Sequence, residues 1–72
     1  MPLVNAPIDM ELKVIKILVD EKTKRHLENL GILLNANLRI LSESNGDVVV
    51  KVKEGRLAIN KETALKIFVA PA

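Results

Sequence analysis

The sequence predicts a mainly β fold, a small antiparallel barrel of about five strands with one short helix and one helical turn. Short runs rich in β-branched residues recur along the chain, and the pairs Asn45-Gly46 and Glu54-Gly55 between them predict tight turns. A helical stretch closed by a glycine separates the first two runs. The 72 residues suit one domain, 1–72, whose core must be aliphatic because Phe68 is the only aromatic residue.

The chain is expected to begin with an anchored segment, residues 1–9, in which prolines disfavour a regular helix. Leu3, Val4 and Ile8 are the apolar groups that this segment offers to a core. Residues 11–19 then predict a first strand. Their polar positions do not alternate strictly, which indicates a slip or bulge near Ile15.

A short helix is predicted from Asp20, whose carboxylate can accept a hydrogen bond from an early free N–H. Its end follows a recognisable pattern. With Leu30 as the C-cap, Gly31 falls at the next position, where a left-handed backbone is required. Ile32 and Leu27 then occupy the two positions whose apolar contact often accompanies a Schellman ending.

The second half of the chain predicts four more strands and a last helical turn. The expected strands are 37–42, 48–53, 56–60 and 67–69; the turns are 44–47 and 54–55; the helical turn is 61–66, capped by Asn60 and followed by a strand that ends at Pro71. Tight hairpins and a helical turn before the last strand favour a barrel of SH3-like type, in which closure removes exposed sheet edges. An open α+β sheet with one helix packed on it is the alternative.

Composition excludes several function classes. Eleven basic residues against nine acidic ones give too small an excess to argue for nucleic acid, and stacking aromatic residues are scarce. The absence of cysteine favours the cytoplasm and excludes a thiolate metal site, and no apolar run predicts membrane insertion. No phosphate-binding glycine loop and no nucleophile motif is present, so we expect neither an enzyme nor a cofactor.

The order of these features resembles the FeoA family of the bacterial ferrous iron transport system. The residues that carry the resemblance are Leu3, Pro7-Ile8, 14–17, Leu27, Leu30-Gly31-Ile32, Leu38, Ile40, Asn45-Gly46, 50–52, 56–59, Glu62-Thr63-Ala64, Ile67 and Val69. Leu34-Asn35 stands where the family commonly has Pro-Gly, and Asn35 can still adopt a left-handed turn. Arg25-His26-Leu27 replaces a frequent Arg-Arg-Leu.

The resemblance implies an SH3-like barrel and a non-enzymatic, cytoplasmic role beside FeoB, the membrane GTPase-linked iron permease. The alternative is a regulatory domain that resembles the SH3-like module of iron-dependent repressors and acts with such a transcription factor. A third possibility is weak self-association through the strand 48–52.

The family's link to iron raises the question of transition-metal ion binding. His26 is the only histidine, and Glu28 lies near it in sequence, but no cluster with ligand spacing accompanies them. The favoured interpretation is a solvent-facing helical histidine, and no metal site is predicted.

A protein-docking face is the predicted functional site. It comprises two basic residues that the helix is expected to expose, together with the residues that end the helix and the aliphatic residues after it. These residues are Lys24, Arg25, Leu30, Gly31, Ile32, Leu33 and Leu34. If residues 32–34 are extended, their three aliphatic side chains cannot all point into one small barrel, and an exposed one can bind a partner. The other interpretation is that all three seal the end of the barrel beneath the helix.

Overall fold

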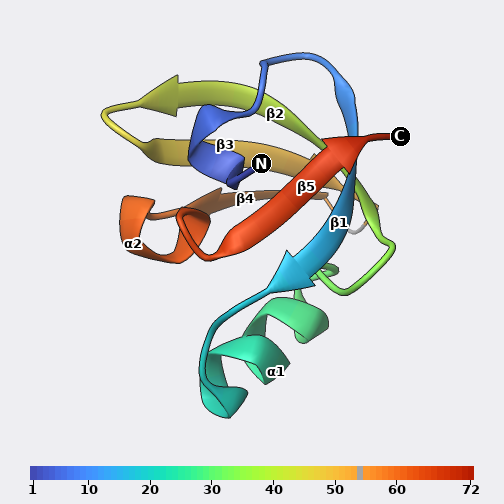
Figure 1. Cartoon of the computed structure of the whole chain (residues 1–72), viewed down its shortest axis with the longest axis vertical. Coiled ribbons are helices and arrows are strands. Elements are labelled where there is room, and N and C mark those ends of the chain that lie inside the picture. The colour runs from blue at the N-terminus through green and yellow to red at the C-terminus, as the bar shows by residue number, and fades with distance from the viewer. Residues whose placement is uncertain (54) are drawn as a thin grey trace.

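Five antiparallel strands form one sheet of order β4-β3-β2-β1-β5 in the computed structural model, which describes residues 1–53 and 55–72. The strands are β1 (Glu11–Ile17), β2 (Asn37–Ser44), β3 (Asp47–Val52), β4 (Gly55–Ile59) and β5 (Ile67–Pro71). The helical elements are the 3₁₀ turn η1 (Leu3–Asn5), α1 (Glu21–Asn29) and α2 (Lys61–Ala64). Figure 1 shows α1 at one end of the molecule, beyond the end of β1, and α2 beside β4 and β5.

The sheet curves around one hydrophobic core, to which every strand contributes. Among its buried residues are Leu12, Ile40, Val50, Ile59 and Val69 from the strands, with Leu3, Leu27 and Ala64 from the helical elements. Burial on a single inner face explains the period-2 pattern of the strands. The predicted SH3-like barrel is confirmed, and α1 projects from its end instead of covering an open sheet (Figure 1).

The predicted irregularity in the first strand is a β-bulge at Ile15. Val14 pairs with Val69 of β5 and Lys16 pairs with Phe68, so Ile15 is the extra residue, and its side chain is exposed. β1 ends at Ile17, before the predicted 19, and the Leu18 N–H makes one further bond of 2.8 Å, to the Lys66 carbonyl. A second bulge, which the sequence did not predict, displaces Leu41 between Ile40 and Ser42 of β2.

The N-terminal segment is anchored as predicted, but one residue is placed differently. Leu3 is fully buried, and Met1 exchanges two backbone hydrogen bonds of 2.8 and 2.9 Å with Val69 along the outer edge of β5. Ile8, expected in the core, is exposed. The turn at residues 8–9 explains the difference, since Asp9 has a φ of 63° and its N–H donates to the Ile40 carbonyl at 2.9 Å.

The hairpin between β2 and β3 is confirmed, with positive φ at both Asn45 and Gly46. Asn60 caps α2 through a 3.0 Å bond from the Thr63 N–H. That helix ends at Ala64, two residues before the predicted 66. The turn predicted at 54–55 begins at Glu54, which lies outside the described residues.

The strand 48–52, through which weak self-association is expected, has no free edge in the sheet. β3 pairs with β2 on one side and with β4 on the other, so its backbone hydrogen-bonding groups face partners within the sheet. A second copy therefore cannot pair with this strand through its backbone, and weak self-association by other contacts stays a prediction.

Candidate functional site

Helix α1 is fixed at both ends by short-range hydrogen bonds. At its start the Thr23 N–H donates to the Asp20 carboxylate at 3.1 Å. At its end the Ile32 N–H donates to the Leu27 carbonyl at 2.9 Å, and the Gly31 N–H donates to the Glu28 carbonyl at 3.0 Å. With Gly31 at a φ of 98°, this is the predicted Schellman ending.

The chain after the helix makes a second fixed turn, over residues 33–36. The Ala36 N–H donates to the Leu33 carbonyl at 3.0 Å, and Asn35 takes a φ of 69°, the left-handed conformation predicted for it. Two further hydrogen bonds join this turn to β1. The Asn35 N–H donates to the Val14 carbonyl at 2.8 Å, and the Val14 N–H donates to the Ala36 carbonyl at 2.9 Å. Leu33 and Leu34 are therefore held on a backbone that is bonded on each side of them.

The structure divides the predicted docking residues into two groups. Ile32 is fully buried, and Leu30, Gly31 and Lys24 are half-buried. Leu33 and Leu34 are 45% and 51% exposed, and Arg25 is exposed on the helix. The interpretation in which all three aliphatic residues seal the barrel is wrong, because the turn at 33–36 directs the chain away from the core after Ile32. Ile32 itself is a core residue and offers no surface to a partner.

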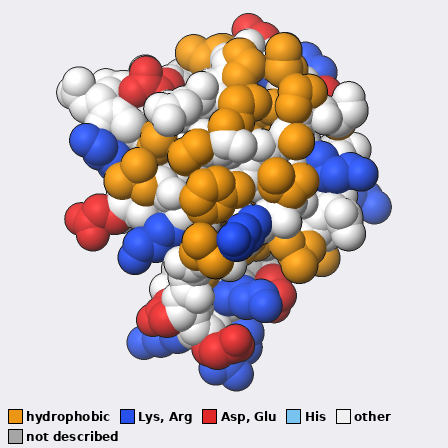
Figure 2. Space-filling view, viewed as in Figure 1, with side chains coloured by type: hydrophobic (Ala, Val, Ile, Leu, Met, Phe, Trp, Pro, Cys, Tyr) orange, Lys and Arg blue, Asp and Glu red, His pale blue; other side chains and the backbone are white. Residues whose placement is uncertain are grey.

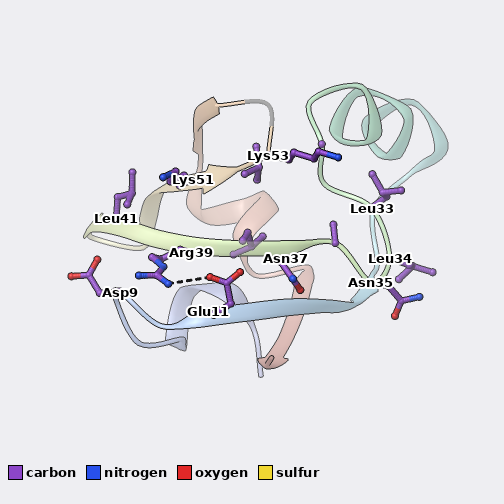
Figure 3. Close-up of a pocket in the computed structure, with 14 residues that line it drawn as sticks. Asp9, Glu11, Leu33, Leu34, Asn35, Asn37, Arg39, Leu41, Lys51 and Lys53 are labelled. Atoms are coloured by element: carbon purple, nitrogen blue, oxygen red, sulfur yellow. Dashed lines mark hydrogen bonds and ion pairs between the residues drawn. The ribbon is translucent and has the colours of Figure 1, made fainter.

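Leu33 and Leu34 lie at one end of a groove with a volume of about 1000 Å³. Figure 3 shows the outer surface of β2 along this groove, with Arg39 and Asn37 on it, Lys51 and Lys53 on the side of β3, and the two leucines toward α1. The bulged residue Leu41 lines the groove as well. Sequence reasoning missed these strand residues. Period-2 alternation already places Arg39, Lys51 and Lys53 on outer faces, but only the strand register brings them together.

The Glu11 carboxylate lies beside the groove and binds the Arg39 guanidinium at 3.1 Å. Both side chains are close to half exposed, so this pair contributes little stability, ~0–1 kcal/mol. Elsewhere, the Thr23 side chain and N–H hydrogen-bond the Asp20 carboxylate and lower its pKa. This shift reflects helix capping and not a reactive group.

Helix α1 carries a largely charged surface. Figure 2 shows acidic and basic side chains gathered around it, below a body on which hydrophobic side chains predominate. His26 is exposed on this helix, as the solvent-facing interpretation predicts. Within residues 1–53 and 55–72, no group of three or more His, Asp or Glu side chains is placed to hold a metal ion. No helix in the described part of the chain is long and apolar enough to cross a membrane.

Comparison with solved structures gives close matches to two kinds of protein. A crystal structure of an iron uptake regulatory protein, FeoA, is 26% identical and superposes with a TM-score of 0.84, over 100% of this chain and 96% of that one. The solution structure of FeoA from Chlorobium tepidum is 20% identical with a TM-score of 0.88, over 99% of this chain and 70% of that one.

The second kind is a manganese-dependent transcriptional repressor, 21% identical with a TM-score of 0.88. All of this chain superposes on 41% of that protein, so the likeness concerns one part of the repressor and its fold alone. No curated protein sequence matches the chain significantly. The FeoA domain model matches residues 1–71, and the chain therefore belongs to the FeoA domain family.

Proposed function

We propose that this chain is a non-enzymatic accessory protein of bacterial ferrous iron uptake. It acts in the cytoplasm, where it docks on the cytosolic region of a FeoB-like membrane GTPase-permease and modulates iron movement. Family membership supports the link to iron transport. The observation that carries the docking proposal is the pair Leu33 and Leu34, two exposed aliphatic side chains on a turn that is hydrogen-bonded to β1 and directly follows the residues that close α1.

A fixed apolar pair suits protein docking for an energetic reason. Burying an exposed leucine side chain on binding contributes about 1.5–3 kcal/mol at full burial, and an already ordered turn loses little conformational entropy. Arg25 and the half-buried Lys24 on α1 can supply polar contacts around this apolar centre. Leu30, Gly31 and Ile32 take part by holding the turn in place.

Charge substitutions at the leucine pair test this proposal, with controls that the chain itself supplies. Leu33→Asp and Leu34→Asp should each weaken binding to the cytosolic region by about tenfold or more. Leu65→Asp and Leu18→Asp are matched controls, because their side chains are 45% and 52% exposed but lie outside the turn. Equal loss of affinity in all four variants would argue against a docking site at this turn.

The second candidate is a regulatory role with an iron-dependent transcriptional repressor. The superposition of the whole chain on part of a manganese-dependent repressor favours it. Under this alternative the chain should bind a repressor and not the transporter. A binding assay that offers both partners separately, with purified chain, decides between the two candidates.

A further inference from the structure

A row of charged side chains crosses the outer face of the barrel beside the leucine pair. Glu11 of β1 pairs in register with Arg39 of β2, Arg39 with Lys51 of β3, and Lys51 with Arg56 of β4. Directly opposed residues of antiparallel strands project from the same face. The row therefore reads acidic, basic, basic, basic across four neighbouring strands, and all four side chains are exposed.

Three adjacent cations on one face are unfavourable on their own. Strands lie about 4.8 Å apart, and like charges directly opposite each other destabilise a sheet. Among residues 1–53 and 55–72, the ion pair in this row is the 3.1 Å contact of Glu11 with Arg39, the first cation. Lys53, two residues after Lys51 along the chain, adds another positive charge to the groove. An anionic ligand laid across this row relieves the repulsion and gains charge-assisted contacts.

The aliphatic residues that line the groove indicate which class of anionic ligand fits it. Leu33 and Leu34 meet it at one end, and Leu41 lines it on β2. Nucleic acid is disfavoured, because Phe68, the only aromatic residue, lies on β5 and does not line the groove, so no aromatic ring is present there for a base to stack on. A protein segment that combines carboxylates with aliphatic side chains matches both the cations along the strands and the leucine pair at the end of the groove.

From this arrangement we propose that the groove binds an acidic, aliphatic segment of a partner protein. Its carboxylates contact Lys51 in the groove and Arg56, which lies opposite Lys51 on β4 beside the groove, and its aliphatic side chains pack on Leu33 and Leu34. The inference rests on the proposed function for the identity of the partner, but the chemistry of the groove can be tested without it.

The test uses a fluorescently labelled synthetic peptide of alternating glutamate and leucine, followed by anisotropy. A peptide in which glutamine replaces glutamate is the neutral control. The acidic peptide should bind about tenfold more tightly than the neutral one and weaken as salt rises. Equal binding of the two peptides, or no binding of either, would overturn the inference. Tighter competition by a single-stranded oligothymidine would overturn the choice of a protein ligand.

Lys51→Glu is the informative variant, because it places an acid between two arginines and creates favourable cross-strand pairs. The variant should therefore fold, and it should bind the acidic peptide about tenfold more weakly than the original chain. Lys22→Glu makes the same charge change on exposed α1, outside the groove, and should leave affinity within about twofold. An equal loss of affinity for the acidic peptide in both variants would show that only the net charge of the chain matters, and it would overturn the inference.

A binding measurement with the cytosolic region of the transporter distinguishes failure of this inference from failure of the proposed function. If it binds the original chain and Lys51→Glu equally, docking stands and the groove is not its site. If it binds neither while the acidic peptide still depends on Lys51, the proposed function fails and the groove remains a site for an acidic segment.

Discussion

The Ile32 N–H donates a 2.9 Å hydrogen bond to the Leu27 carbonyl, and the side chains of both residues are buried in the same core. This relationship closes helix α1 and sets the direction of the chain that follows. Because Ile32 is directed inward, the next turn presents Leu33 and Leu34 to solvent. The exposed leucine pair is thus a consequence of how the helix ends.

Substitution at Gly31 tests this helix ending. Gly31→Ala should lower the free energy of unfolding by about 1–2 kcal/mol, since a Cβ atom is disfavoured at its φ of 98°. Chemical denaturation measures the change. Asn35→Gly is the matched control at the neighbouring left-handed position, where the asparagine already tolerates positive φ, and it should change stability by less than about 1 kcal/mol. Unchanged stability in Gly31→Ala would contradict the role of this glycine.

Leu27 is predicted to be the anchor of α1 to the barrel. It is the buried residue of that helix, at 4% exposure, so Leu27→Ala should cost about 2–5 kcal/mol. Amide hydrogen exchange in α1 should accelerate more than exchange in β3. Uniform acceleration across both elements would instead indicate that the helix and the barrel unfold as one unit.

The barrel and its sequence of elements could be predicted from local signals. The Asn45-Gly46 turn, the caps at Asp20 and Asn60 and the Schellman ending each depend on residues close together in the chain. The bulge at Ile15 was visible because a slip in one strand changes its own polar pattern.

The remaining features depend on contacts between distant segments. Ile8 is exposed because Asp9 binds the Ile40 carbonyl, which no local pattern indicates. The row of charged side chains on the outer face could not be predicted, because it exists only in the register that aligns Arg39 with Lys51 and Lys51 with Arg56. The local pattern also does not determine whether Leu33 and Leu34 enter the core, since the turn at 33–36 is set by its bonds to Val14.

The cap of α1 should make stability depend on acidic pH. The Thr23 side chain and N–H lower the pKa of folded Asp20 below its unfolded value, near 3.8. Its contribution is therefore fully present above the unfolded pKa and is lost as pH falls through the lowered folded pKa. Asp20→Asn retains a capping oxygen without titrating, so its unfolding midpoint should fall less than that of the original chain on acidification. Parallel pH profiles would contradict this assignment.

Gly46 should resist substitution for two reasons that act together. Its φ is 92°, and a Cβ atom there would lie 2.6 Å from Cγ of Lys61. Gly46→Ala should therefore destabilise the chain by about 1–2 kcal/mol in thermal or chemical denaturation. The variant Gly46→Ala/Lys61→Ala removes the Cγ contact and separates the two causes. No recovery in the double variant, relative to Lys61→Ala alone, would assign the cost to backbone conformation and to the remaining 3.1 Å approach to the Lys61 Cβ.

The most direct test of the docking proposal is an NMR titration of the isotope-labelled chain with the cytosolic region of a FeoB-like transporter. Saturable amide shifts centred on residues 33–36, and extending to Arg25 and along β2, are the predicted result. Shifts confined to other surfaces would contradict the docking site. An unchanged spectrum at high partner concentration, with both proteins folded, would contradict the proposal that this chain binds that region.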